Sequence, residues 1–480
     1  MSTARALSER EILSESNLHK AAFRRLGKHL TTDPEHGLLI GRSDVERIVS
    51  AARAGIGTRV ARLIKASSSA LEDLPAGCLY SRLDEPDWRV AAQICEVLRN
   101  PHISKNAGTL DTPSLQRKIR EALARSEPFD LAIAWGQPKR TAGGLKTLGP
   151  FADLAEMYAI ANLVVVVEVV AKLARRPVRL KVLTGGRRFF SALFTRPQLA
   201  VAYDAQRQSI ADALAGPGVI ALTPFLHPGA EHEQESEAWR ARFDEALADV
   251  TDGMIESKFG TVLLNIDWDH VLAPSAQERH YLPHNIPLPA SIDKWLQERD
   301  LTSRNRLVRA AIGSLVFPRH QSEWFETFNQ DEEVLEDAIA FIHAVAWEST
   351  RRYIALHVAD ADDVASSASD SNGANVLRLT VHEKRDRRDI PAIFTLGPKG
   401  GNQLSQHVMA AVSATGEITF GSFAEYSGGQ VVPIRLRPEE SYALFDWLAS
   451  AGQPLCLIEA SERDSTDRIC AAFTSNQAGS

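Results

Sequence analysis

The feature that most constrains the fold is a regular alternation of short apolar runs with longer helical stretches between residues 115 and 225. Runs of strand length fall at 129–135, 179–184 and 219–225, and the periodicity of helices covers 115–125, 153–174 and 197–214. Alternation at this spacing is typical of βαβ units, whose strands lie parallel in one sheet. We therefore predict an α/β fold with a largely parallel sheet, and a ligand site beyond the carboxyl ends of its strands.

The rest of the chain divides by composition around this block. Residues 1–110 read as a helical N-terminal extension, with a capping box at Ser43 and Glu46. The α/β domain is expected at 111–460, with a charged, helical insertion-like region at 230–350, and residues 461–480 form a tail. A β-rich C-terminal portion is predicted with strands at 376–383, 392–396, 431–436 and 454–459, a hairpin around Thr415-Gly416 and a helix at 438–449.

Charge and composition exclude several classes of protein. The 480 residues carry a formal net charge of −7 with a sequence pI of about 6.1, whereas a protein that coats nucleic acid needs a basic surface. The charged N-terminus lacks the apolar stretch of a secretory signal, so we expect a cytoplasmic protein. The four cysteines stand singly, in a pattern that suggests neither a zinc knuckle nor a disulfide framework.

One apolar stretch, Met157–Ala174, resembles a membrane span. It contains Asn162, Glu168 and Lys172, and it is shorter than the roughly 20 apolar residues that cross a bilayer. We predict a helix buried against the sheet.

A basic, glycine-bearing loop follows the first predicted strand. Lys139, Arg140 and Lys146 supply cations, while Asp153 and Glu156 enter the first turn of the next helix, where the helix dipole favours carboxylates. Such a loop is suited to bind a phosphate or carboxylate and to offer a base. The alternatives are that the cations face solvent and that the two carboxylates only cap the helix.

Several separated motifs resemble one enzyme family. They are Pro138-Lys139, Gly149, the D-x-x-E entry at Asp153 and Glu156 with Ala159 and Leu163, the strand end Thr184–Phe189 (TGGRRF), the helix Val201–Arg207 (VAYDAQR), the strand Arg378–His382 (RLTVH), and His407. Together they resemble the isonitrile (isocyanide) synthases of the pyoverdine and dityrosine biosynthesis family, over about residues 113–460. The sequence departs from the family's pattern at Gly185 and at Leu404–Gln406.

The resemblance implies a modified Rossmann-like domain and an activity. The expected enzyme of specialised metabolism converts the α-amine of a Tyr- or Trp-like amino acid to an isonitrile, with ribulose 5-phosphate as co-substrate and one-carbon donor. Neither a metal nor a redox cofactor is implied. Its partners would be these small molecules, with no nucleic acid and no membrane, and it could form a homodimer.

Each chemical role has candidate residues. Lys139, Asp153, Glu156, His382 and His407 are the expected acid–base residues, with Lys139 serving as an acid if neighbouring cations depress its pKa. The expected anion-binding residues are Arg140, Lys146, Arg187, Arg188 and Arg378.

Three alternatives remain open. The same fold could form an N-formyl amino acid, or it could be a noncatalytic sensor of an anionic metabolite. The D-x-D-H motif could also bind a metal through Asp267, Asp269, His270, His280 and His284, but their spacing fits no firm template and we expect no metal site.

Overall fold

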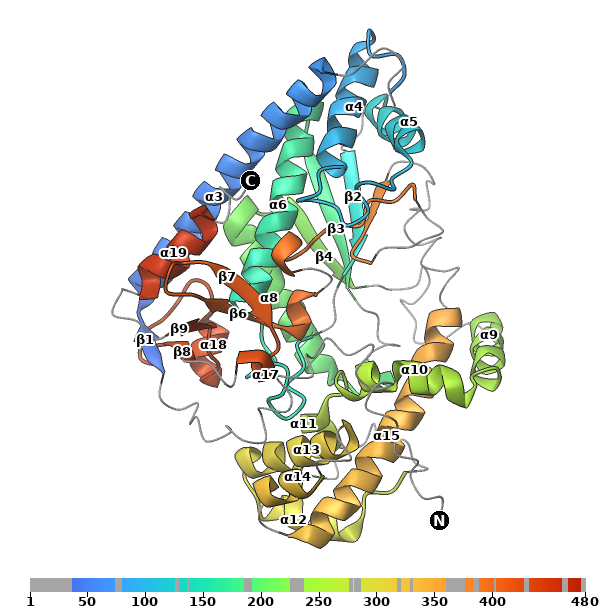
Figure 1. Ribbon diagram of the computed structural model, residues 1–480, viewed down its shortest axis with the longest axis vertical. Coiled ribbons are helices and arrows are strands. Elements are labelled where there is room, and N and C mark those ends of the chain that lie inside the picture. Colours follow the sequence, from blue (N-terminus) through green and yellow to red (C-terminus); the bar gives the residue numbers. More distant parts are fainter. Residues whose placement is uncertain are drawn as a thin grey trace.

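The computed structural model describes residues 37–73, 80–125, 129–135, 138–184, 192–224, 237–275, 279, 286–316, 321–328, 331–359, 376–382, 388–400, 403–426, 431–459 and 465–475. Within these ranges it is a mixed α/β protein, as predicted. A parallel sheet with its helices forms one end of the elongated molecule, a helical body forms the other, and a second sheet lies to one side between them (Figure 1).

The predicted parallel sheet is present, with strand order β4-β3-β2-β5. Its strands are β2 (Phe129–Ala134), β3 (Val178–Thr184), β4 (Ile220–Pro224) and β5 (Val376–Thr380), and every pairing is parallel. The chain runs from β2 to β3 and β4 on one side, whereas β5 joins the other side of β2. In open parallel sheets, the crevice at such a reversal is where ligands bind.

The central helix of this layer is α6 (Leu154–Ala174), which connects β2 to β3. It is apolar on all sides and long enough to cross a membrane, but 83% of its most apolar window is buried within the protein. The buried amide of Asn162 donates to the carbonyl oxygen of Thr395 at 2.6 Å, so its polar group is satisfied inside the core. The prediction of a buried helix is confirmed.

The N-terminal region is helical, as predicted, and its helices share the core of the parallel-sheet layer. α3 (Arg42–Glu72), α4 (Pro86–Leu98) and α5 (Thr112–Leu123) precede β2, and α8 (Pro197–Ala215) links β3 to β4. Ile48 and Ile56 of α3 share one apolar cluster with Leu131 of β2. The predicted cap lies two residues after the real one, because α3 starts after Gly41, whose N–H donates to the carboxylate of Asp44 at 2.9 Å.

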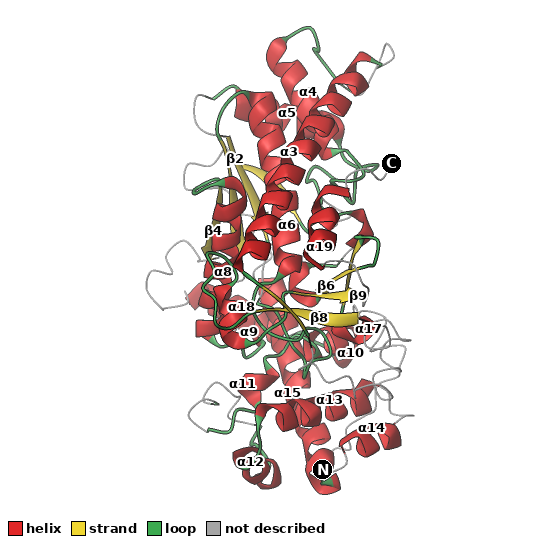
Figure 2. Cartoon of the chain, turned by 90° about the vertical axis from the view of Figure 1, so that its left-hand side faces the viewer, coloured by secondary structure: helices red, strands yellow, loops and turns green. Residues whose placement is uncertain are grey.

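The β-rich C-terminal portion forms a second sheet with strand order β1-β8-β9-β6-β7. It contains β6 (Met409–Val412), β7 (Ile418–Gly421), β8 (Val431–Leu436) and β9 (Cys456–Glu459), and β1 (Leu38–Ile40) joins it from the N-terminal side. The hairpin around Thr415-Gly416 is confirmed. The helix α19 (Ser465–Ser475), in the expected tail, packs beside α3 (Figure 2).

Two predictions in this portion are wrong. Residues 392–396 form no strand, because only Ala392 and Ile393 make isolated bridges, to Thr380 and Ser104. The predicted helix at 438–449 is the shorter α18 (Asp446–Ala451), preceded by Phe445 in the left-handed region at φ 70°. The remaining short elements are α17 (Phe423–Tyr426), η2 (Pro398–Gly400) and η3 (Ser405–His407).

The insertion-like region is helical, as expected, and has its own core. It comprises α9 (Glu237–Ala248), α10 (Asp252–Leu263), α11 (Trp268–Val271), α12 (Ala290–Gln297), α13 (Leu301–Val316), α14 (Gln321–Phe328) and α15 (Glu332–Ala359). The basic loop reaches this body at Gly143, where φ is +67° and an added Cβ would lie 2.9 Å from the carbonyl oxygen of Asn305. The loop therefore packs closely against α13 of the helical region.

Candidate functional site

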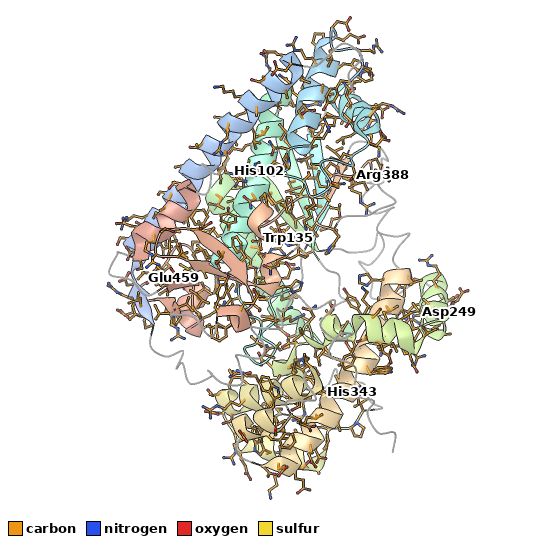
Figure 3. The ribbon with its side chains drawn as sticks, viewed as in Figure 1. His102, Trp135, Asp249, His343, Arg388 and Glu459 are labelled. Atoms are coloured by element: carbon orange, nitrogen blue, oxygen red, sulfur yellow. The ribbon has the colours of Figure 1, made fainter. Side chains whose placement is uncertain are left out.

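The predicted basic loop, the end of β5 and η3 meet at the reversal in the parallel sheet. β2 and β5 end in register, with Ala134 beside Thr380. Trp135, which follows β2, lies near the centre of the molecule (Figure 3), and its indole N–H donates to Oε1 of Gln406 in η3 at 3.1 Å. Segments about 270 residues apart thus form one site at the carboxyl ends of the strands, where open α/β sheets bind ligands.

The innermost part of the site is an ion cluster of Lys139, Asp153 and Glu156, each at most 1% exposed. The Nζ atom of Lys139 lies 2.6 Å from Oδ2 of Asp153, 3.2 Å from Oε2 of Glu156 and 2.8 Å from the carbonyl oxygen of Val408. An ammonium group has three N–H bonds, and here each has an acceptor. Lys139 therefore has no donor left for a substrate anion.

Both carboxylates also cap α6. Oδ1 of Asp153 accepts from the N–H of Ala155 at 2.8 Å, and Oε2 of Glu156 accepts from the N–H of Asp153 at 3.0 Å. The remaining oxygen of Glu156 accepts from the hydroxyl of Tyr203 at 2.7 Å. The capping interpretation is confirmed, and all four oxygens are used within the protein.

The pKa values of Lys139 and Asp153 are both raised in this cluster, for different reasons. Burial lowers the pKa of Lys139, but the carboxylates of Asp153 and Glu156 outweigh burial and raise it above its usual value. The condition for Lys139 to act as an acid, a depressed pKa, is thus not met. Burial raises the pKa of Asp153 well above its usual range, against the attraction of Lys139 and with the repulsion of Glu156.

A second lysine of the same loop has the opposite surroundings. The Nζ atom of Lys146 lies 2.6 Å from Oδ1 of Asn265 and 2.8 Å from Nδ1 of His407, and the residue is 4% exposed. Burial, and then the charge of Arg140, lower the pKa of Lys146 well below its usual value. Lys146, and not Lys139, therefore has the depressed pKa that was the condition for an acid role of Lys139.

His407 is half-buried and shares this environment. Burial and then Lys146 lower its pKa well below the usual range, with smaller contributions from His382, Arg140 and Lys139. These contributions place His382 within electrostatic reach of His407. Lys146 and His407 thus contact each other directly, and burial disfavours the charged form of both.

Two buried guanidinium groups also lie in this region: Arg140, whose charge acts on Lys146 and His407, and Arg207, which contacts Trp135 at the end of β2. Arg140 donates to Oγ1 of Thr195, but its Nε and Nη1 have no hydrogen-bond partner among the described residues, and its Nη1 is 4.0 Å from Oδ2 of Asp267. Burial lowers its pKa to about 10, while Asp267 opposes the shift. Unfilled donors on a buried cation are costly, so the acceptor atoms of a ligand could satisfy them.

Arg207 is a site residue that the sequence did not reveal. Its guanidinium lies 4.1 Å from the ring centre of Trp135, and its Nη2 donates to the carbonyl oxygen of Trp135 at 3.2 Å. Its Nε and Nη1 have no hydrogen-bond partner within the described part of the chain, although Nη1 is 3.7 Å from a carboxylate oxygen of Asp204. The only signal was a lone arginine ending the helical segment VAYDAQR.

The remaining predicted residues have different placements. Arg378 pairs with Ala132 in the register of β5 and β2. It alternates along β5 with the core residues Leu377 and Leu379, so it lies on the face of the sheet opposite to theirs. His382 is exposed just beyond β5. Arg187 and Arg188 lie outside the described residues, as do His280 and His284 of the metal alternative.

The described part of the D-x-D-H motif is used for internal contacts. Asp267 pairs with Arg196 at 3.1 Å, and Nδ1 of His270 contacts the carbonyl oxygen of Phe194 at 2.7 Å. Within the described ranges, no three His, Cys, Asp or Glu side chains group as metal ligands.

Comparison with known proteins gives a distant likeness. Neither family models nor curated proteins match the sequence. Among solved structures, PvcA from Pseudomonas aeruginosa is similar over 77% of this chain and 99% of its own, with 12% identity and a TM-score of 0.41. At this level the neighbour carries no argument about chemistry, which has to come from the site.

Gly149 is predicted to be required for the shape of the basic loop. A Cβ there would lie 2.1 Å from Oε1 of Gln453, whose amide makes two 2.9 Å bonds with the backbone of Phe151 and cannot move without losing them. Gly149→Ala is expected to cost about 1–3 kcal/mol by overpacking. Urea denaturation would measure this cost, with Gly57→Ala on α3, where an added Cβ meets nothing, as the control. Equal stabilities of the two variants would contradict the prediction.

Proposed function

We propose that this protein is an isonitrile synthase-like enzyme, which joins the α-amine of an amino acid to ribulose 5-phosphate and releases the amino acid as an isonitrile. The observation that carries the proposal is the buried Lys146–His407 contact, together with buried arginines that have donors without partners among the described residues, at the reversal of a parallel sheet. The motif resemblance supports the choice of this reaction among those that such a site could perform.

The proposed reaction needs two anion sites, because the amino acid carries a carboxylate and the sugar carries a phosphate. Arg140 and Arg207 are buried cations whose Nε and Nη1 atoms have no hydrogen-bond partner among the described residues, and guanidinium groups match both anions in geometry. We assign them to substrate binding, with Arg378 as a further candidate on β5.

The reaction also needs proton transfers during imine formation and elimination. A general base works best when its pKa lies near the operating pH. Burial lowers the pKa of Lys146 from its high usual value toward that range, and His407, whose pKa burial lowers further below neutral, contacts it directly. We assign proton transfer to these two residues, with His382 nearby. Lys139, Asp153 and Glu156 would hold the loop and the start of α6 in position.

The test is incubation of the purified protein with ribulose 5-phosphate and a panel of amino acids, with tetrazine trapping of any isonitrile. We expect a trapped product with at least one aromatic amino acid. Mass spectrometry of the same mixtures would reveal an N-formyl product, which would replace the proposed reaction by its alternative. Stabilisation by ribulose 5-phosphate without any turnover would instead indicate a sensor.

Arg207 gives a quantitative check of substrate binding. Arg207→Lys removes the planar fork and the stacking on Trp135, and a lost charge-assisted hydrogen bond of about 1.5–3 kcal/mol corresponds to a rise in KM of roughly tenfold or more. Arg179→Lys, at a half-exposed arginine bound to Asp130, is the matched control and should leave KM unchanged. Similar KM values for both variants would remove Arg207 from the site.

A further inference from the structure

We propose that Lys146 is a nucleophile that forms a Schiff base with a carbonyl substrate bearing an anionic group. This inference rests on the proposed function and deepens it, because it gives the sugar phosphate a covalent attachment point on the enzyme. The proposal comes from the contacts of Lys146, taken together with those of Lys139 in the same loop.

The two lysines differ in their acceptors. Lys139 has three oxygen acceptors, two of them on carboxyl groups, as a buried ammonium requires. Lys146 has two neighbours, the Asn265 oxygen and Nδ1 of His407, and no carboxylate within ion-pair distance of its Nζ in the described part of the chain. A buried ammonium without a counter-ion is strongly unfavourable, whereas a neutral amine is compatible with these two uncharged neighbours.

The contacts also orient the amine. A neutral amine has two N–H bonds and one lone pair. With His407 protonated at Nε2, Lys146 donates one N–H to Oδ1 of Asn265 and the other to Nδ1 of His407. The lone pair then remains available for attack on a carbonyl carbon. Its lowered pKa, caused by burial and by Arg140, agrees with this arrangement.

The chemistry balances without an added oxidant or reductant. The lone pair of Lys146 attacks the carbonyl carbon, and the carbonyl electrons move to oxygen. His407 removes a proton from the nitrogen and returns it to that oxygen. The oxygen and the two amine hydrogens leave as water, so that C=N replaces C=O.

The same intermediate fits the proposed reaction. The α-amine of the amino acid attacks the C=N carbon, the bond from that carbon to Lys146 breaks, and the two hydrogens of the incoming amine pass to Lys146 through His407. The sugar carbon is then joined to the amino acid and Lys146 is restored. The buried guanidinium of Arg140, whose charge acts on Lys146, would bind the anionic group of the carbonyl compound.

The experiment is reductive trapping without an amino acid. The full-length protein is incubated with ribulose 5-phosphate and cyanoborohydride, and the adduct is located by peptide mass spectrometry. We expect one adduct, on Lys146, which decreases when ribitol 5-phosphate, an analogue without a carbonyl group, competes. Lys146→Arg should lose the adduct, and Lys181→Arg, at a partly exposed lysine on β3, should keep it.

A second measurement covers the case in which Lys146→Arg does not fold. The wild-type protein should accelerate exchange of the ketone oxygen of ribulose 5-phosphate with labelled water, and His407→Gln, which keeps Lys146, should slow this exchange. Adducts spread over surface lysines, or absent from Lys146, would overturn the inference even if the wild type makes an isonitrile. An adduct on Lys146 without product from any amino acid would instead support the Schiff base and overturn the proposed reaction.

Discussion

Lys139→Met is expected to lower the free energy of unfolding by about 3–5 kcal/mol, because it removes one partner of a buried ion cluster. The change leaves the carboxyl groups of Asp153 and Glu156 facing each other, both at most 1% exposed. Lys146→Met is the matched control, since it leaves only the neutral acceptors of Asn265 and His407 without a donor, at a cost of about 1–3 kcal/mol. Denaturant titration of both variants measures the difference.

The loss in Lys139→Met should become smaller as the pH falls. The pKa of Asp153 is already raised in the folded protein by burial, and without the attraction of Lys139 it should rise further. A carboxyl group whose pKa is raised by folding contributes stability below its unfolded pKa and loses that contribution as the pH rises through its folded pKa. A variant equally destabilised in acid and at neutral pH, or no less stable than Lys146→Met, would contradict this account.

The largest expected effect on activity is that of His407→Ala. It removes the base that contacts Lys146 at 2.8 Å, and the loss of a positioned acid–base group lowers turnover by about 10²–10⁴-fold. The protein should stay folded, because His407 is only half-buried and lies in the short η3 helix. Turnover with ribulose 5-phosphate and the accepted amino acid is the measurement, combined with a thermal melt.

His357→Ala provides the comparison for this variant. His357 is an exposed histidine of α15 in the helical body, outside the site, and its replacement should leave turnover unchanged. If His407→Ala keeps more than about a tenth of the wild-type turnover, it does not have the role of a general base.

The fold was predictable where local pattern and tertiary packing agree. The strands and helices between 129 and 224 were expected within a few residues of their observed bounds, because each carries the periodicity of its own secondary structure. The strand prediction for residues 392–396 was wrong, because a short apolar run has the same pattern whether it pairs along a strand or makes two isolated bridges. The membership of α3 and α19 in the core was also hidden, because an amphipathic helix does not specify the surface that it covers.

The candidate site shows the same division between local pattern and tertiary context. By itself, the sequence determined the parallel βαβ arrangement, and therefore the edge of the sheet at which the loop bearing Lys139 and Lys146 would lie. Only the tertiary structure decided which lysine has carboxylate counter-ions, because the carboxylates beside Lys139 come from the next helix, whereas the His407 beside Lys146 comes from 261 residues away. The physical reason is that the pKa of a buried amine depends on its neighbours in space, and two lysines of one loop are alike until the chain folds around them.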